Sequence, residues 1–181
     1  MVLNVICGNR GERLPRLMNE IKTQNIDYNL WEGVFDPKSV IRSINLAHKK
    51  IVQYAKDTNM ECICIAEDDV QFTCPTSYKY FIENIPQEYD LYLGGIYLGD
   101  IQEDKSVKHF TGMHLYIIHN KFYDTFLSTD PNTHIDIALA DLGYYKVCNP
   151  FAAIQFNGFS ANTGKEENYD AIISNRELYC G

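Results

Sequence analysis

The sequence predicts a single α/β domain over residues 1–181, with a mostly parallel central sheet flanked by helices. Strand and helix patterns alternate in the order β-α-β-α-β up to residue 66, which is typical of parallel strands joined by covering helices. The strand segments are continuously apolar, as expected where helices cover both faces of a sheet. A length of 181 residues suits one domain, and no repeat or linker divides the chain.

The first half of the chain contains three predicted strands and two predicted helices. The strands are expected at residues 2–7, 28–31 and 62–66, and the helices at residues 12–22 and 40–55. Gly8 and Gly11 end the first strand. Ser39 is a plausible N-cap for the second helix, because its hydroxyl can accept a hydrogen bond from an unpaired backbone N–H. Cys62 and Cys64 alternate within the third strand and therefore share one face of the sheet.

The second half has weaker patterns. Strands are expected at residues 91–93 and 115–119, helices at 77–84, 121–127 and 135–142, and an extended stretch at 145–148. Residues 157–181 are polar and are expected to be irregular.

Composition limits the classes of function. With 16 Lys and Arg against 24 Asp and Glu, the net charge is −8 and the sequence pI is about 5.0. Such a surface repels phosphate backbones, so general nucleic-acid binding is not expected. A pocket for one nucleotide is still possible, because a divalent cation can screen its phosphates. The 13 tyrosines suit pockets that stack bases or sugars, or they reflect compositional bias.

We expect the protein to be cytoplasmic. No stretch approaches the ~18 apolar residues of a membrane span, and the first apolar run ends at Gly8, too early for the core of a signal peptide. The six cysteines have no C-x-x-C spacing, and they are expected to be reduced.

The strongest chemical signal is the triplet Glu67-Asp68-Asp69, directly after an apolar strand. Ligands of open α/β sheets bind beyond the carboxyl ends of the strands. Adjacent like charges are costly unless a cation neutralises them, and carboxylates suit Mg²⁺ or Mn²⁺ bound together with substrate phosphates. A solvated acidic turn that caps a following helix is the alternative.

The triplet with its flanking residues resembles the acidic, DXD-like signature of glycosyltransferase family 25, which includes lipopolysaccharide-type and collagen-type sugar transferases with a GT-A fold. Six further segments are similar to that family in order and spacing. They are Arg10 to Leu14, Glu32-Gly33-Val34, Ser43 to His48, Tyr89 to Gly95, and Gly112 to Ile118 followed by His134-Ile135-Asp136. The resemblance covers residues 2–160. Ala47 departs from it, because the family has a serine there.

The resemblance implies a GT-A-like, Rossmann-like domain that transfers a hexose from a nucleotide-diphosphate sugar, UDP-linked, to an acceptor hydroxyl with inversion. Mn²⁺ or Mg²⁺ would stabilise the leaving diphosphate. Asp69 and Glu67 would bind the metal, with His134 as a further ligand and Asp68 in the same nucleotide site. The acceptor is a glycan, a lipopolysaccharide or another hydroxyl compound.

Asp136 is the candidate base for the acceptor proton. Alternatively, it is an ordinary acid at the start of a helix, where the dipole favours it. Arg10 and Arg13 follow the first strand and would meet the diphosphate or the uracil, or they pair with Glu12 or Glu20 on the surface.

Three further features have open interpretations. Gly94 and Gly95 allow a ligand to approach the backbone closely, or they form a bulge or a plain turn. His134 is a weak metal signal taken alone. His48, on the apolar stripe of its helix, is either packed or a ligand.

Two other functions remain possible. The short chain and Ala47 are compatible with a non-catalytic nucleotide-sugar-binding or glycan-binding module of the same fold. The same acids could also serve a metal-dependent phosphohydrolase. The sequence contains no P-loop, no Gly-x-Ser-x-Gly elbow and no Gly-x-Gly-x-x-Gly motif.

Overall fold

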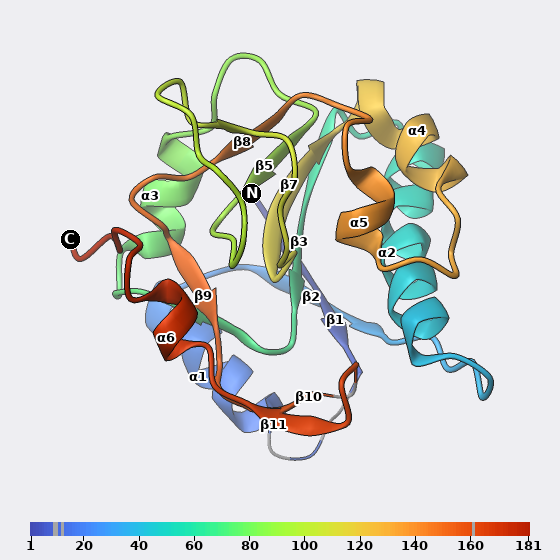
Figure 1. Ribbon diagram of the computed structural model, residues 1–181, viewed down its shortest axis with the longest axis horizontal. Coiled ribbons are helices and arrows are strands. Elements are labelled where there is room, and N and C mark those ends of the chain that lie inside the picture. Colours follow the sequence, from blue (N-terminus) through green and yellow to red (C-terminus); the bar gives the residue numbers. More distant parts are fainter. Residues whose placement is uncertain (9–10, 12, 161) are drawn as a thin grey trace.

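A mixed seven-stranded sheet forms the centre of the computed structural model, with helices on both of its faces (Figure 1). The structure describes residues 1–8, 11, 13–160 and 162–181. The strand order is β2-β1-β3-β7-β5-β8-β6. The bounds of its strands are β1 Leu3–Cys7, β2 Tyr28–Glu32, β3 Cys62–Glu67, β5 Leu91–Leu93, β6 Ser106–Val107, β7 Leu115–His119 and β8 Tyr145–Val147.

The mostly parallel sheet is confirmed by strand direction. β1, β2 and β3 are parallel, and β5 and β8 run the same way, because both β3 and β5 pair antiparallel with β7 between them. β6 is antiparallel to β8. Three of the six pairings are therefore antiparallel: two because β7 is inserted between strands of the common direction, and one because β6 runs against β8.

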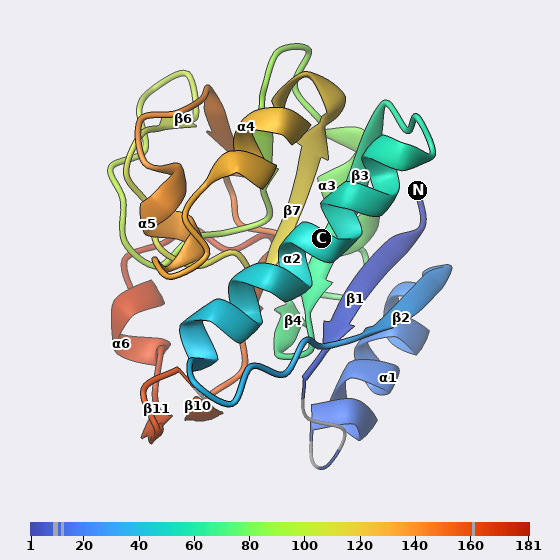
Figure 2. The ribbon, with the colours of Figure 1, turned by 90° about the vertical axis from the view of Figure 1, so that its right-hand side faces the viewer.

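Helices cover the two faces as the apolar patterns require. On one face, α2 (Val40–Asp57), α4 (Tyr123–Ser128) and α5 (Ile135–Leu139) pack against the sheet. On the other face, α1 (Arg13–Gln24) and α3 (Ser77–Glu83) do so. Figure 2 shows α2 lying diagonally across the face of the sheet that it covers. The Ser39 hydroxyl accepts a hydrogen bond from the Arg42 backbone N–H at 3.1 Å, which confirms the predicted N-cap.

Several short elements were not predicted. β4 (Val70–Phe72) follows the acidic triplet and pairs antiparallel with β9 (Ala153–Gln155). The segment expected to be irregular contains a hairpin of β10 (Gly158–Ser160) and β11 (Lys165–Glu167), followed by α6 (Asp170–Ile173). A 3₁₀ turn, Asn120–Phe122, precedes α4. α5 ends at Leu139, three residues earlier than expected. The unpredicted elements among these are three or four residues long, too short to show a period.

The core contains two clusters separated by the sheet. One includes Ile51, Ile65 and Tyr116, and the other includes Leu17, Cys64 and Phe81. Cys62 packs in the same cluster as Cys64, as their alternation predicted, and the six cysteines are free thiols. In the described part of the chain, every helix is too short or too polar to span a membrane.

Candidate active site at the carboxyl end of β3

The acidic triplet lies at the carboxyl end of β3, where the sequence placed it. Glu67 is the last residue of β3, and Asp68 and Asp69 form the turn into β4. The alternative of a solvated turn that caps a helix is wrong, because a strand follows and the turn is buried. Asp68 and Asp69 are only 4% and 3% exposed. This burial requires partners for both charges.

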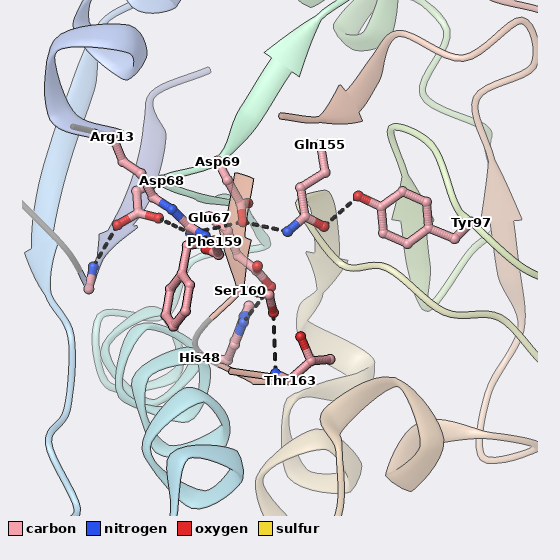
Figure 3. A network of polar contacts seen from close by, with 11 residues as sticks. Arg13, His48, Glu67, Asp68, Asp69, Tyr97, Gln155, Phe159, Ser160 and Thr163 are labelled. Carbon is pink, nitrogen blue, oxygen red and sulfur yellow. Dashed lines mark hydrogen bonds and ion pairs between the residues drawn. The ribbon is translucent and has the colours of Figure 1, made fainter. Parts of the chain in front are cut away.

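Arg13, in the first turn of α1, supplies the positive charge. Its Nη1 donates to Asp68 Oδ1 and to Asp69 Oδ2, at 2.9 Å in each case, and its Nη2 donates to the Phe159 carbonyl oxygen at 2.6 Å (Figure 3). Burial lowers the pKa of Arg13, but Asp69 and Asp68 outweigh it and raise the pKa overall. Arg13 thus pairs with the triplet rather than with Glu20, whose carboxylate accepts the Phe72 backbone N–H at 3.0 Å.

Each acid has its own set of contacts. Asp68 Oδ2 accepts the backbone N–H of Gly8 at 2.9 Å, at the end of β1. Asp69 Oδ2 also accepts from Gln155 Nε2, and Gln155 Oε1 accepts the Tyr97 hydroxyl. Glu67 Oε1 lies 3.2 Å from His48 Nε2 in α2. Elements that are far apart in the sequence therefore meet at the triplet.

Asp69 carries the feature that points most clearly to a ligand. Its Oδ1 is buried and has no hydrogen-bond partner among the described residues. Burial, followed by the charge of Glu67, raises the pKa of Asp69 to about 8, although Arg13 and Gln155 favour its ionised form. An oxygen that is removed from water and left unpaired costs free energy unless a ligand binds it.

The pKa of Glu67 shifts the other way. Burial raises it, but the hydrogen bond from His48, together with the charges of His48, His114 and Arg13, outweighs burial and lowers the pKa of Glu67 below its usual value. The Glu67 side chain is also 27% exposed, against 6% for Asp68 and 4% for Asp69. The triplet therefore combines a partly accessible carboxylate whose pKa is lowered with a buried one whose pKa is raised.

The triplet offers the type of oxygen ligand that a hard divalent cation binds, although the part of the chain that the structure describes does not bring the predicted ligands together as one metal site. Carboxylate oxygens are the ligands that Mg²⁺ and Mn²⁺ prefer, often only one or two of them together with substrate phosphates. The unpaired Asp69 Oδ1 meets that requirement. Among the described residues, however, no three His, Cys, Asp or Glu side chains are grouped as a metal site.

His134 contacts another part of the chain. It precedes α5, and its Nδ1 lies 3.4 Å from Asn162 Nδ2, in the loop between β10 and β11. Arg10 lies outside the described residues, so its predicted role has no structural counterpart here.

Protein atoms fill the space beside both predicted ligand-binding glycines. A Cβ on Gly94 would lie 2.6 Å from the Leu115 side chain, and one on Gly95 would overlap the Ala153 carbonyl oxygen. The Gly94 carbonyl also accepts the Ala152 and Ala153 N–H groups. Close packing of protein atoms, which was not among the interpretations offered by the sequence, explains both residues without a ligand.

Asp136 lies in the first turn of α5 and is oriented by two backbone donors. Its Oδ2 accepts the Gly112 N–H at 3.2 Å, and its Oδ1 accepts the Ile137 N–H at 2.9 Å. Asp136 lines a cavity of about 670 Å³, together with residues 98–100, 102, 106, 108–111, 137 and 140. The triplet does not line this cavity.

A short path of packed residues links Asp136 to the triplet. Gly112, which hydrogen-bonds Asp136, has a φ of +97° and no room for a side chain, because a Cβ would lie 3.0 Å from the Tyr97 ring. Tyr97 then connects to Asp69 through Gln155. The cavity lies at one end of this network of packed and hydrogen-bonded residues, and the acidic triplet lies at the other.

Sequence reasoning missed four members of this network: Tyr97, Gln155, Tyr116 and His114. His114 is 1% exposed, donates its Nε2 hydrogen to the Ala153 carbonyl at 3.1 Å, and leaves Nδ1 without a partner among the described residues. Tyr97 and Gln155 belong to no motif. His114 and Tyr116 lie in the segment Gly112 to Ile118 that resembles the family, but that resemblance assigns them no role. A second signal was the polar His48 on an apolar helical stripe, since Tyr116 is its partner.

Comparison with known proteins supports the fold. No protein-family profile matches the chain, and no curated protein sequence is significantly similar to it. Among solved structures, HddC from Yersinia pseudotuberculosis has a TM-score of 0.55 at 15% identity, covering 85% of this chain and 92% of HddC. A197 from STIV has a TM-score of 0.52 at 15% identity, covering 92% and 94%.

A glycosyltransferase involved in glycosylation of the major capsid of PBCV-1 is more distant, with a TM-score of 0.46 and 11% identity over 83% of each chain. This similarity is too low to bear on function. The neighbours above a TM-score of 0.5 share the fold of this chain, a single Rossmann-like α/β domain.

Proposed function

We propose that the chain is a glycosyltransferase, similar to family 25, that transfers a hexose from a UDP-linked sugar to an acceptor hydroxyl with inversion and with Mn²⁺ or Mg²⁺. The observation that carries this proposal is the buried, unpaired Asp69 Oδ1 at the carboxyl end of a central strand. Ligands of open α/β sheets bind at this edge, beyond the carboxyl ends of the strands. HddC, which shares the fold, is described in a complex with GMP-PN, which supports a nucleotide as the ligand here.

Asp69 and Glu67 would hold the divalent cation, with Asp69 contributing Oδ1. The cation supplies Lewis-acid stabilisation of the negative charge that grows on the leaving diphosphate. Arg13 and the Gly8 backbone keep Asp68 in place beside it. Arg13, being 27% exposed, can also turn toward a phosphate group, which its guanidinium binds well.

Asp136 would accept the proton of the acceptor hydroxyl while the sugar carbon bonds to that oxygen and the diphosphate leaves. The two backbone N–H groups that bind its carboxylate fix its direction. The cavity beside Asp136 gives an acceptor a route to this carboxylate that does not cross the acidic triplet. A base must lie within hydrogen-bond reach of the proton it removes, so the acceptor hydroxyl would have to reach Asp136 and the donor sugar at the same time.

The test is a screen of UDP-glucose, UDP-galactose and UDP-N-acetylglucosamine for hydrolysis or transfer, with and without Mn²⁺. We expect UDP release from at least one donor, dependent on Mn²⁺. No binding and no turnover of any of them with metal present would contradict the proposal. Release of phosphate from a simple phosphate ester would instead favour the phosphohydrolase alternative.

One observation favours a non-catalytic binding module as the second candidate. Arg13 already neutralises Asp68 and Asp69 without a metal. A module of this kind would bind the donor, turn over none with any acceptor, and lose nothing when Asp136 is replaced by Asn.

A further inference from the structure

A buried pair of side chains lies behind Glu67, on the helix-covered face of the sheet. His48 Nε2 is 3.2 Å from Glu67 Oε1, and His48 Nδ1 is 2.9 Å from the Tyr116 hydroxyl. His48 and Tyr116 are both fully buried, at 0% exposure. In Figure 3, His48 lies on the other side of Glu67 from Arg13 and Asp69. We propose that Tyr116 and His48 are positioning residues that hold the Glu67 carboxylate in place for the cation of the proposed donor site.

With a neutral His48 ring, one arrangement of protons satisfies all three groups. An ionised carboxylate can only accept, so the hydrogen of the neutral His48 ring must be on Nε2, facing Glu67. Nδ1 then carries a lone pair, and the Tyr116 hydroxyl is the donor that faces it. Burial raises the pKa of Tyr116 well above its usual value, so that this hydroxyl keeps its proton. Tyr116 therefore selects the tautomer of His48, and His48 orients Glu67.

The three residues come from three elements, α2, β3 and β7, which fixes their positions relative to one another. The chain of hydrogen bonds begins in the core and ends at a carboxylate that is 27% exposed. Because His48 binds Oε1 of Glu67, the carboxylate would keep its orientation while its other oxygen binds a cation. Partners that orient metal ligands in this manner affect metal affinity by about 10–100-fold when removed.

A purely structural role is the alternative, because a buried histidine needs partners wherever it lies. His48 is on the buried stripe of α2 between Ala47 and Ile51, where an apolar side chain would also pack. The two interpretations differ in what removal of the Tyr116 hydroxyl changes. A structural role predicts a loss of stability alone, whereas a positioning role also predicts a loss of cation affinity.

The experiment compares Tyr116→Phe with Tyr145→Phe in the full chain. The matched control Tyr145 is also fully buried, and its hydroxyl donates to the Leu139 carbonyl oxygen. Mn²⁺ binding at a fixed UDP concentration is followed by electron paramagnetic resonance of free Mn²⁺. We expect Tyr116→Phe to weaken Mn²⁺ binding about 10-fold and Tyr145→Phe to leave it unchanged, with similar losses of melting temperature in both.

A second pair of variants tests His48 itself. The amide nitrogen of His48→Gln can donate to Glu67 from about the position of Nε2, so this variant should retain Mn²⁺ affinity within about 3-fold. His48→Leu has similar bulk but no donor, and its affinity should fall at least 10-fold.

The outcomes separate this inference from the proposed function on which it rests. If the wild type binds Mn²⁺ with UDP, and Tyr116→Phe and His48→Leu bind it equally well, the positioning role is overturned and the proposed function stands. If the wild type binds no Mn²⁺ in the presence of UDP, the proposed cation site fails, and the positioning role fails with it.

Discussion

Asp69 is the residue on which the account depends, because it is buried, has one unpaired oxygen and has a raised pKa. A residue with only a packing role would gain nothing from this combination, since an uncharged side chain of the same shape would avoid the cost of burial. The free-energy cost of burying the Asp69 carboxylate is explained if its unpaired Oδ1 binds a cation. This interpretation makes predictions for Asp69 and for its partner Arg13.

Replacing Asp69 by Asn should stabilise the protein in the presence of a chelator, and more so at higher pH. The folded-state pKa of Asp69, about 8, exceeds the ordinary aspartate pKa of 3.8 that applies to the unfolded chain. Between these values the folded state binds more protons than the unfolded state, so the stability of the wild type falls as pH rises. Asparagine titrates in neither state. The gain should therefore grow from about pH 5 to about pH 8 and then level off.

Urea unfolding with EDTA at three pH values between 5 and 9 measures this gain. An advantage of Asp69→Asn that stays the same at all three values would show that Asp69 has an ordinary pKa in the folded protein.

Arg13→Gln should destabilise the metal-free protein by about 1–3 kcal/mol. It leaves two buried carboxylates without their cation, which is costly, although the 27% exposure of Arg13 moderates the effect. Added Mn²⁺ should restore part of the loss. Chemical denaturation with and without Mn²⁺ checks both statements.

Arg42→Gln is the control for Arg13→Gln. Arg42 is 37% exposed and pairs with Asp36 near the start of α2, so its replacement should cost no more than about 0.5 kcal/mol. Equal effects of the two substitutions would argue against a special role for Arg13.

At the scale of elements, the site is formed where the ends of β1, β3 and β9 meet. β9 contributes Gln155, and it can approach because Gly94 and Gly95 after β5 have no side chains. The role of these glycines is therefore to let one backbone pack on another, and this packing brings Gln155 to Asp69.

Gly95→Ala should cost more than about 2 kcal/mol, because its Cβ would overlap the Ala153 carbonyl oxygen, which belongs to the backbone and cannot move freely. Gly8→Ala provides the control, since a Cβ at Gly8 meets nothing within 4 Å. Thermal denaturation of both variants measures the difference. A Gly95→Ala protein as stable as Gly8→Ala would contradict the packing described here.

The amino-acid sequence predicts the long elements well, together with the short strands β5 and β8, and misses other short ones. The continuous apolar run of β1 indicates a buried strand, and the 18 residues of α2 are enough to show a helical period. β4 and β9 have three residues each and are remote from one another in the chain. β10 and β11 are neighbours in the chain but are also only three residues long, too short to show a period. Local pattern therefore contains no information about them, and the hairpin of residues 158–167 was missed for this reason.

The candidate site could be predicted only where its residues are neighbours in the sequence. Three consecutive acids after a buried strand are visible in the sequence as a group. Tyr97 and Gln155, in contrast, reach Asp69 from segments separated by tens of residues, through tertiary packing alone. The link from Arg13 to the triplet also depends on the fold, since the sequence offered Glu12 and Glu20 as equally reasonable partners.

For the whole molecule, the account separates donor binding from acceptor activation. The acids and Arg13 form one part of the site, and Asp136 with its cavity forms the other, connected through Gly112, Tyr97 and Gln155.

Asp136→Asn should therefore lower sugar transfer about 10²-fold or more, because a general base contributes about 10²–10⁴-fold. Binding of Mn²⁺ and UDP should be unchanged, since Asp136 does not contact the triplet. Transfer assays alongside Mn²⁺ titrations measure both. A variant with full transfer activity would exclude Asp136 as the base.

The most direct test of the central claim is the thermal melting shift produced by Mn²⁺ together with UDP, in the wild type and in Asp69→Asn. A ligand that binds only the folded state stabilises it, by about 2.7 kcal/mol at 100 times its dissociation constant. The account predicts a clear upward shift of Tm in the wild type that requires both Mn²⁺ and UDP, and none in Asp69→Asn. The same metal-dependent shift in both proteins would contradict the assignment of Asp69 as a cation ligand.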